Sequence, residues 1–410
     1  MIIPSIDLMG GKAIQLRQGK EKVLERDNPV ELAAEFSKYG EVAVIDLDAA
    51  LGRNDGQDNF ELVKKLCKVA DCRVGGGIRT IERANELLAA GAKKIIIGTA
   101  ATPEFLSQLP KDRLIVALDS KQGKVVDKGW TNDTGKATEA LAKELEPFCS
   151  EFLYTNVDRE GLMQGVDFGA IDSVRAATKN KLTVAGGITT IEEIKKIEQA
   201  GMNSQLGMSI YTGAIKLADA FLSVLRFDAQ TGLIPTIVQD ETGQVLMLAY
   251  SSKESIVRAF ELNSATYYSR SRKEMWTKGE TSGNFQEFLK ARYDCDCDTL
   301  LFTVRQKNVA CHTGSYSCFG DKDFGLDGLY AVVKQKVDNP IEGSYTAAIS
   351  ASETTILDKI AEETAEVIDY KDRQNLVWEI ADLSYFLLVL MAKKGISPQE
   401  VRDELSRRRK

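Results

Sequence analysis

The sequence VGGGIRTIE at residues 74–82 recurs as VAGGITTIE at residues 184–192, an offset of 110 residues from 74 to 184. Asp48 and Asp158 are related by the same offset, and Asp7 and Asp119 are related by 112 residues. Around these repeats, eight short β-rich runs alternate with amphipathic helical stretches. This alternation predicts a parallel sheet closed into a (β/α)8 TIM barrel over residues 1–225, and the repeat predicts two similar half-barrels.

Glycine-rich turns follow the third and fourth predicted strands of each half. Glycine lets backbone N–H groups approach a phosphate, and the helix that follows adds the positive end of its dipole. Two such sites on opposite sides of one mouth suit a substrate with a phosphate at each end, although any one turn can also be an ordinary barrel turn. The candidate phosphate-binding residues are Gly76, Gly77, Gly98, Thr99, Gly186, Gly187, Gly207 and Ser209.

Asp7 and Asp119 each end the first strand of a half, at the carboxyl face where the active sites of such barrels lie. Two carboxyl groups can act as general base and general acid when their surroundings separate their pKa values. A lone aspartate at a strand end is more often a helix N-cap. The symmetric placement of the pair favours the catalytic interpretation.

Residues 226–322 indicate a small β-rich domain, with two strands on either side of a turn at Gly243. This segment contains DCDCD at 294–298. As a strand, DCDCD would present Asp294, Asp296 and Asp298 on one face and Cys295 and Cys297 on the other. Carboxylates suit Mg²⁺ and thiolates suit Zn²⁺. A merely exposed acidic edge strand is the alternative.

The sequence CHTGSYSC at 311–318 adds two more thiols and the single histidine of the chain, His312. Cys295, Cys311 and Cys318 would give three thiolates, and three protein ligands plus water are typical of a catalytic zinc site. Thiolates make the bound water less acidic than neutral ligands do, so a nearby base would help. His312 is the candidate for that base.

Residues 323–410 have a helical pattern that predicts an all-α domain. Glu363 and Glu366 stand three residues apart, and Glu379 and Asp382 repeat this spacing. Each pair therefore lies on one helical face, and two facing helices could build a Mg²⁺ site from four carboxylates. Solvent-exposed charge is the alternative, but the apolar neighbours of Asp382 favour a site.

Composition limits the class of protein. At 410 residues the chain suits two or three domains, and 43% hydrophobic with 28% charged residues is typical of a globular protein. A net charge of −7 and the absence of a long apolar run predict neither a nucleic acid nor a membrane partner. The chain has seven cysteines, four of them between positions 295 and 318, and no export signal, which indicates a cytoplasmic protein whose clustered cysteines bind metal rather than form disulfides.

The runs PSIDLMGGKAIQL (4–16), VIDLDAALG (44–52) and TNVDREG (155–161) resemble the phosphoribosylformimino-AICAR-phosphate isomerase family over residues 1 to about 225. The resemblance implies an Amadori rearrangement of an aminoaldose to an aminoketose. It assigns Asp7 as the base at C2′, Asp119 as the acid that opens the ribose, Thr155 as an orienting hydroxyl and Trp130 as an aromatic lid. This chain departs from the family pattern at Gln15, Glu160 and Met208.

The metal-bearing segment, together with YSRSR (268–272), Trp276 and KGETSG (278–283), closely resembles phosphoribosyl-AMP cyclohydrolase. The resemblance implies a zinc-activated water that opens the purine ring, and a homodimer with the metal site at its interface. Cys297 stands where that family commonly has glycine, either as a bystander or as a competing ligand. The implied phosphate- and ribose-binding residues, although such side chains are usually solvated surface, are Arg270, Arg272, Lys278, Thr281 and Ser282.

The last segment, with GSYT at 343–346 and Lys359 before its glutamates, looks like a MazG-like phosphoribosyl-ATP pyrophosphohydrolase. Mg²⁺-assisted release of pyrophosphate is implied, although Ser352 and Thr355 replace a glycine and a lysine of the family pattern. The three resemblances together predict a trifunctional enzyme of histidine biosynthesis acting on phosphoribosyl nucleotides. The alternatives are a bifunctional hydrolase with a non-catalytic phosphosugar-binding or scaffolding barrel, and a zinc-stabilised assembly without catalysis.

Overall fold

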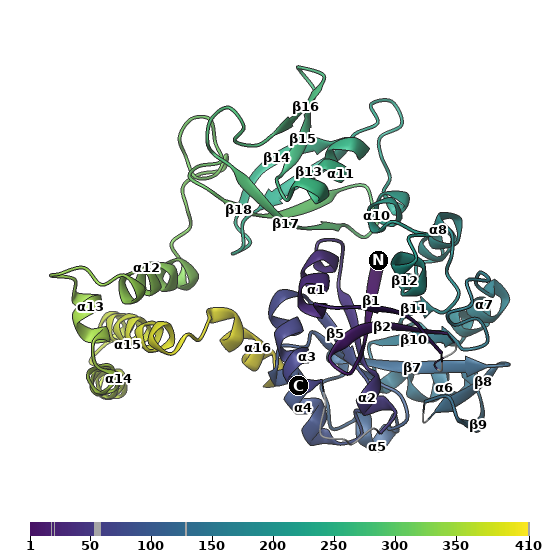
Figure 1. Ribbon diagram of the computed structural model, residues 1–410. Helices are drawn as coiled ribbons and strands as arrows, with labels where there is room; N and C mark the ends of the chain where they lie inside the picture. The colour runs from purple at the N-terminus through teal and green to yellow at the C-terminus, as the bar shows by residue number, and fades with distance from the viewer. Residues whose placement is uncertain (18, 20, 53–58, 128, 409–410) are drawn as a thin grey trace. The chain divides into compact units, whose positions relative to one another are not determined.

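The computed structural model describes residues 1–17, 19, 21–52, 59–127 and 129–408. They form two compact units, Met1–Phe319 and Gly320–Arg409. The first unit contains the predicted barrel and the β-rich segment, and the second is helical. Figure 1 labels the elements of both.

In the described part of the chain, eight parallel strands close into a ring, so the prediction of a (β/α)8 barrel is confirmed. Each strand is hydrogen-bonded to the next, β7 pairs with β10, and β12 returns to β1. Apolar residues of the strands pack against the helices outside them and form the main core of the barrel. In ring order they are β1 (Ile2–Met9), β4 (Val42–Asp46), β5 (Cys72–Gly75), β6 (Lys94–Ile97), β7 (Leu114–Lys121), β10 (Glu151–Asn156), β11 (Lys181–Ala185) and β12 (Asn203–Leu206).

The internal repeat recurs in the starts of two barrel helices, α4 and α8, which Figure 1 labels. Helices α4 and α8 begin at Ile81 and Ile191, and Thr80 and Thr190 cap them by accepting a hydrogen bond from the third backbone N–H of each helix. The same turn chemistry therefore starts both helices. The barrel helices are α1 (Pro29–Ser37), α2 (Leu47–Ala50), α3 (Phe60–Val69), α4 (Ile81–Ala89), α5 (Pro103–Leu106), α6 (Thr138–Leu145), α7 (Phe168–Ala177), α8 (Ile191–Gln199), α9 (Met208–Tyr211) and α10 (Leu217–Val224), with 3₁₀ turns at Lys111–Arg113 and Glu146–Phe148.

A β-hairpin follows the first strand of each half. Strands β2 (Lys12–Arg17) and β3 (Glu21–Arg26) follow β1, and β8 (Lys124–Asp127) and β9 (Asn132–Ala137) follow β7. The outer strand of each hairpin, β3 or β9, is mostly polar and exposed and lacks the apolar alternation that predicts a strand. The hairpins bring Gln15, Val126 and Thr134 to the mouth of the barrel.

The β-rich segment forms a four-stranded sheet in the order β14, β13, β18, β17, with a separate hairpin of β15 and β16. Its core continues into the barrel, because Tyr39 and Phe221 pack on Phe260 with ring centroids 4.2 and 5.4 Å away. The elements are β13 (Ile234–Gln239), β14 (Val245–Ser251), α11 (Lys253–Leu262), β15 (Thr266–Ser269), β16 (Glu274–Thr277), β17 (Gln286–Tyr293) and β18 (Leu300–Gln306).

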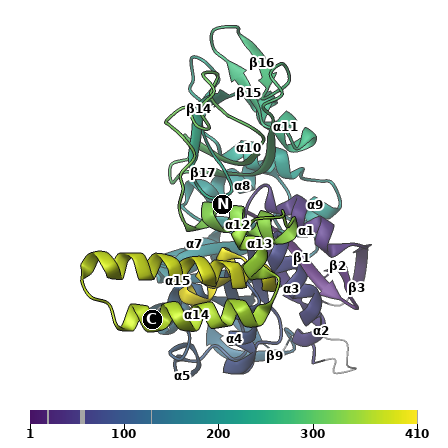
Figure 2. The same ribbon diagram turned by 90° about the vertical axis from the view of Figure 1, so that its left-hand side faces the viewer.

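The second unit is all-α, as its sequence pattern predicts. Helices α14 and α15 lie side by side and form a hairpin (Figure 2). Phe386, Val389 and Ile356 belong to the small core between the helices. The helices are α12 (Leu326–Asp338), α13 (Tyr345–Ser350), α14 (Glu353–Ile368), α15 (Arg373–Lys394) and α16 (Pro398–Arg408).

Helix α15 is, within the described ranges, the one helix long and apolar enough to cross a membrane by length and composition. A mostly buried core helix of a soluble protein meets the same criterion, but only 22% of the apolar window of α15 is buried, although Phe386, Val389 and Ala392 lie in the core of the helical unit. That the chain has no membrane partner stays a prediction.

A buried ion network occupies the amino-terminal end of the barrel interior. Arg73 donates to Glu151 and Glu41, and Lys94 donates to the second carboxylate oxygen of Glu151 at 2.9 Å. Burial by itself raises the pKa of Glu151, but Arg73 and Lys94 lower it to about 2. The charged groups of Arg73 and Glu151 are almost completely buried, so each needs the other to offset its loss of hydration.

Replacing Arg73 by Met is therefore expected to destabilise the barrel by about 3–5 kcal/mol, because Glu151 and Glu41 lose their buried partner. Urea unfolding followed by tryptophan fluorescence and circular dichroism measures this change. Lys136→Met, which removes an exposed ion pair with Glu144, is the control and is expected to cost less than about 1 kcal/mol. Equal effects of the two substitutions would contradict the prediction.

Candidate functional sites

The barrel has a cavity of about 380 Å³ at the carboxyl ends of its strands. Asp7 and Asp119 line it from β1 and β7, which stand four places apart in the ring of eight and so face each other. The turns after β5 and β11 are also opposite, as are those after β6 and β12. Each half-barrel thus contributes two glycine-rich turns, and the two sets lie on opposite sides of the ring.

The glycine turns have backbone that requires glycine. Gly76 has φ +99°, and a Cβ there would meet the carbonyl oxygen of Asp46 at 2.1 Å. Its repeat partner Gly186 has φ +86°, and a Cβ there would lie 2.8 Å from the carbonyl oxygen of Asn156. Gly77, Gly98, Thr99 and Gly207 also line the main cavity, and Gly187 and Ser209 line a small adjoining pocket.

Asp7 and Asp119 have different hydrogen-bond partners. Ser5, two residues earlier on the same strand face, donates to Asp7 at 3.0 Å. Trp130 donates its indole N–H to Asp119 at 2.8 Å, and the Thr155 hydroxyl also bonds Asp119. Burial raises the pKa of Asp7 to about 6 and raises that of Asp119 above its usual range, against these hydrogen bonds. The two acids are therefore in the unequal surroundings that acid–base chemistry requires.

Trp130 and Thr155 reach Asp119 by different routes. Thr155 lies on β10 directly across from Asp119 in the parallel register. Trp130 has φ +66° in the connection between β8 and β9, and its ring packs against the backbone of Gly19. The ring therefore spans between the loops of the two halves, at the edge of the cavity.

Two of the residues at which this chain departs from the isomerase pattern also line the cavity. Burial, followed by the charges of Asp7 and Asp119, raises the pKa of Glu160 to about 8. Gln15 is 2% exposed, and its amide nitrogen has no hydrogen-bond partner in the described structure. Sequence spacing cannot reveal either property, because both depend on what surrounds the side chain.

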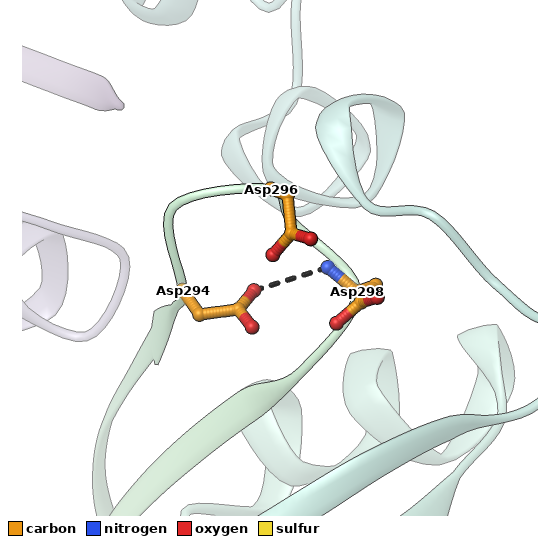
Figure 3. A group of neighbouring side chains, drawn as sticks. All are labelled: Asp294, Asp296 and Asp298. Carbon is orange, nitrogen blue, oxygen red and sulfur yellow. Dashed lines mark hydrogen bonds between the residues drawn. The ribbon is translucent and has the colours of Figure 1, made fainter.

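In the β-rich segment, Asp294, Asp296 and Asp298 converge within 4.8 Å of one another, as Figure 3 shows. They do so on a loop, so the prediction of a strand over 294–298 is wrong: β17 ends at Tyr293. The Asp294 carboxylate accepts hydrogen bonds from the backbone N–H of Asp298 at 3.0 Å and of Thr299 at 3.1 Å, which closes a turn. The three carboxylates are exposed and suit a divalent cation.

The thiols of this segment separate into three environments. Cys311 and Cys318 interact with each other, and Thr313 lies 3.0 Å from the Cys311 sulfur and lowers the pKa of that thiol. Cys295 is exposed beside Asp296 and does not join them in a three-ligand cluster among the described residues. Cys297 is buried against the barrel, so Cys295 and Cys297 do not share an exposed face.

The remaining predicted residues of this segment surround the thiol pair or lie on exposed loops. Lys278 donates to the carbonyl of Ala310, next to Cys311. Arg270 stacks on Tyr250 with 3.8 Å to the ring centroid, and Arg272 pairs with Glu274. His312, Thr281 and Ser282 are exposed.

In the helical unit, Glu363, Glu366 and Glu379 approach within 4.8 Å of one another across α14 and α15. Burial, then the charges of Glu366 and Asp382, raises the pKa of Glu363. A hydrogen bond that the Glu366 carboxyl group donates to Glu379 raises the pKa of Glu366. This mutual repulsion is what a bound Mg²⁺ would relieve, and Asp382 lies one turn beyond Glu379 on the same helix.

The fold and these sites define a multidomain enzyme: a (β/α)8 barrel with glycine-rich turns around a pair of acids, followed by two regions with carboxylate and thiol clusters. The family model described as histidine biosynthesis protein matches residues 1–216, phosphoribosyl-AMP cyclohydrolase matches 247–320, and phosphoribosyl-ATP pyrophosphohydrolase matches 326–409. The chain belongs to the histidine biosynthesis protein family, and it carries the cyclohydrolase and pyrophosphohydrolase domains of the same pathway.

Individual relatives match different parts of the chain. The histidine biosynthesis bifunctional protein HisIE of Pyrococcus furiosus is 41% identical over 206 residues, which are 47% of this chain and 99% of that protein. An imidazole-4-carboxamide isomerase of Methanocaldococcus jannaschii is 38% identical over 231 residues, 54% of this chain and 97% of that protein. A histidine biosynthesis trifunctional protein of Saccharomyces bayanus is 43% identical over 183 residues, but these are only 23% of its length.

Proposed function

We propose that this chain catalyses three reactions of histidine biosynthesis on phosphoribosyl nucleotides: hydrolysis of phosphoribosyl-ATP to phosphoribosyl-AMP and pyrophosphate, opening of the purine ring, and Amadori isomerisation of the resulting aminoaldose. The observation that carries the isomerase part is the pair Asp7 and Asp119, which face each other between two opposite sets of glycine turns. A substrate with a phosphate at each end would place its ribose between these acids.

In the isomerisation, Asp119 donates a proton to the ribose ring oxygen and Asp7 removes the proton from C2′. The hydrogen bonds from Trp130 and Thr155 fix the position of the Asp119 carboxyl group. Burial favours the neutral form of Asp119, which an acid needs. The direct test incubates the purified chain with the aminoaldose ribotide and follows formation of the ketose. Isomerase turnover by the wild type supports the proposal. If the wild type has cyclohydrolase activity but no isomerase turnover, the barrel is a binding or scaffolding domain.

The isomerase is expected to lose kcat/KM as the pH falls below about 6, because Asp7 must be ionised to act as a base and its pKa is raised to about 6. Above about pH 8, ionisation of Glu160 adds a negative charge beside both acids, so a second decline is expected. Glu160→Gln should weaken the alkaline decline, to which deprotonation of the acid Asp119 also contributes, and should keep the acid decline. A rate that stays constant down to pH 4.5, roughly the ordinary range of a carboxyl pKa, would contradict the assignment of Asp7.

The donor atoms of the cyclohydrolase segment suit metal ions. Cys311 and Cys318 offer soft thiolates. Asp294, Asp296 and Asp298 offer hard oxygens. We place Zn²⁺ at the thiolates and Mg²⁺ at the carboxylates. Bound Zn²⁺ would supply an activated water for ring opening. His312 is the proposed proton acceptor, and Lys278, Arg270, Arg272, Thr281 and Ser282 are the proposed contacts to phosphate and ribose. Because Cys295 lies apart, a second copy of the chain would complete the thiolate set in a homodimer.

The pyrophosphohydrolase residues fit Mg²⁺, since Glu363, Glu366 and Glu379 already converge and Asp382 adds charge nearby. Bound Mg²⁺ would assist attack of water on the triphosphate. Changing Glu366 to Gln is expected to lower pyrophosphate release at limiting Mg²⁺ by about 10-fold or more, with partial recovery at high Mg²⁺, because one ligand is lost and not the fold. Lys394→Gln, which removes an exposed ion pair with Glu353 and leaves the carboxylate cluster intact, is the control. Loss that no Mg²⁺ concentration relieves would contradict a ligand role.

A further inference from the structure

The loop that carries Asp294, Asp296 and Asp298 is attached to the barrel. The strand before it, β17, borders the barrel through Lys290 and Arg292, whose side chains lie 3.2 and 3.4 Å from the Asp71 carboxylate. The backbone N–H of Ala291 donates to the carbonyl of Lys38 at 2.9 Å. The loop therefore begins on a strand whose position the barrel already determines.

Cys297 continues this attachment within the loop itself. It is 4% exposed, and its sulfur lies 3.5 Å from one carboxylate oxygen of Glu198 on α8. The other oxygen of Glu198 pairs with the α-ammonium group of Met1 at 2.9 Å. The carbonyl of Cys297 accepts a hydrogen bond from the backbone N–H of Arg226 at 2.7 Å. Both the side chain and the backbone of Cys297 are thus held by groups outside the loop.

The backbone of Cys297 has a conformation that favours glycine over cysteine. Its φ of +65° is a left-handed conformation in which a Cβ is unfavourable and glycine is not. A glycine would fit this backbone without strain but would leave the contact with Glu198 unmade. The contact between the Cys297 sulfur and Glu198 of the barrel therefore explains why cysteine occupies this position.

We propose that Cys297 is a positioning residue through which the barrel holds the Asp294–Asp298 loop in its cation-binding shape. The Asp294 carboxylate closes the turn on the backbone of Asp298 and Thr299, and Cys297 lies inside that turn. Fixing Cys297 from the barrel side therefore limits the positions of the exposed carboxylates on either side of it. The proposal rests on the proposed cation-binding function of the loop, and it makes the barrel a structural part of the cyclohydrolase site.

The test measures binding of Mn²⁺ alone to the full-length chain by electron paramagnetic resonance, with Asp296→Asn used to identify the contribution of the loop. Cys297→Gly, which relieves the backbone strain, is expected to weaken that contribution about 10-fold, as loss of an outer contact to a metal site does. Glu198→Ala, made in the barrel and outside the loop, should weaken it similarly. Cys297→Ser should retain most of the affinity because the hydroxyl can reach Glu198.

Asn263→Gly is the matched control, because Asn263 is another non-glycine residue with positive φ, 50°, at the end of α11. It should leave Mn²⁺ binding unchanged. Wild-type affinity in both Cys297→Gly and Glu198→Ala would overturn the positioning role while leaving the cation site in place. If Asp296→Asn leaves Mn²⁺ binding of the wild type unaltered, the loop binds no cation, and both the proposed site and the positioning role are overturned.

Discussion

Isomerase turnover is expected to fall by about 10²–10⁴ when Asp119 is replaced by Asn, because general acid catalysis contributes a factor of that size. Asn preserves the shape of the side chain and its contact with the Trp130 indole, which donates to Asp119 at 2.8 Å. It cannot transfer a proton to the ribose oxygen. Asp7→Asn is expected to have an effect of the same order, since the base at C2′ is then missing. A coupled assay that follows loss of the aminoaldose measures both.

Asp127→Asn is the control for these two substitutions. Asp127 also lines the mouth of the cavity, and its carboxylate accepts a hydrogen bond from Asn132 at 2.7 Å in the β8–β9 hairpin. An effect within about 3-fold is expected, because no proton transfer is assigned to it. If Asp7→Asn and Asp119→Asn retain near-wild-type kcat, the barrel uses other groups. If all three lose activity equally, the loss reflects the charge of the mouth.

Cyclohydrolase turnover is expected to be lost almost completely in Cys311→Ser and in Cys295→Ser, although the two residues lie apart within one chain. Each substitution removes one thiolate of the proposed zinc site, and serine is a poor zinc ligand. Circular dichroism and isomerase activity should remain, because Cys295 is exposed and Cys311 lies on a loop at the edge of the sheet. A structural zinc would instead unfold the segment when it is lost.

Mixing the two inactive variants distinguishes a shared site from a site within one chain. In a two-fold dimer that pairs Cys295 of one copy with Cys311 and Cys318 of the other, each mixed dimer has one intact site. Random exchange should then restore about a quarter of the wild-type activity, because half of the dimers are mixed. Zinc content should recover in proportion. No recovery after verified subunit exchange would contradict the shared site.

The sequence predicts the positions of some site residues better than those of others. Asp7 and Asp119 follow from strand periodicity and the repeat, because a strand end in a parallel barrel has a fixed position at the carboxyl face. The strand over 294–298 was predicted wrongly, because alternation in DCDCD imitates a strand while Asp294 closes a turn on the backbone. A strand would place the three aspartates on one face but hold Asp294 and Asp298 about 13 Å apart. Only the turn brings their carboxylates together and separates Cys297 from Cys295.

The sequence by itself determined the order of the regions, the eight alternating strands and helices, the duplicated half-barrel and the glycine turns, since periodicity and turn chemistry are properties of neighbouring residues. Only the tertiary structure decided which polar and charged side chains are buried away from solvent. It raises the pKa of Glu160 to about 8 beside two other acids, and it buries the amide nitrogen of Gln15 where no described residue bonds it. It also places Cys297 against Glu198, 99 residues away in the chain. Desolvation and contacts between distant segments depend on the whole packed arrangement, which no local pattern contains.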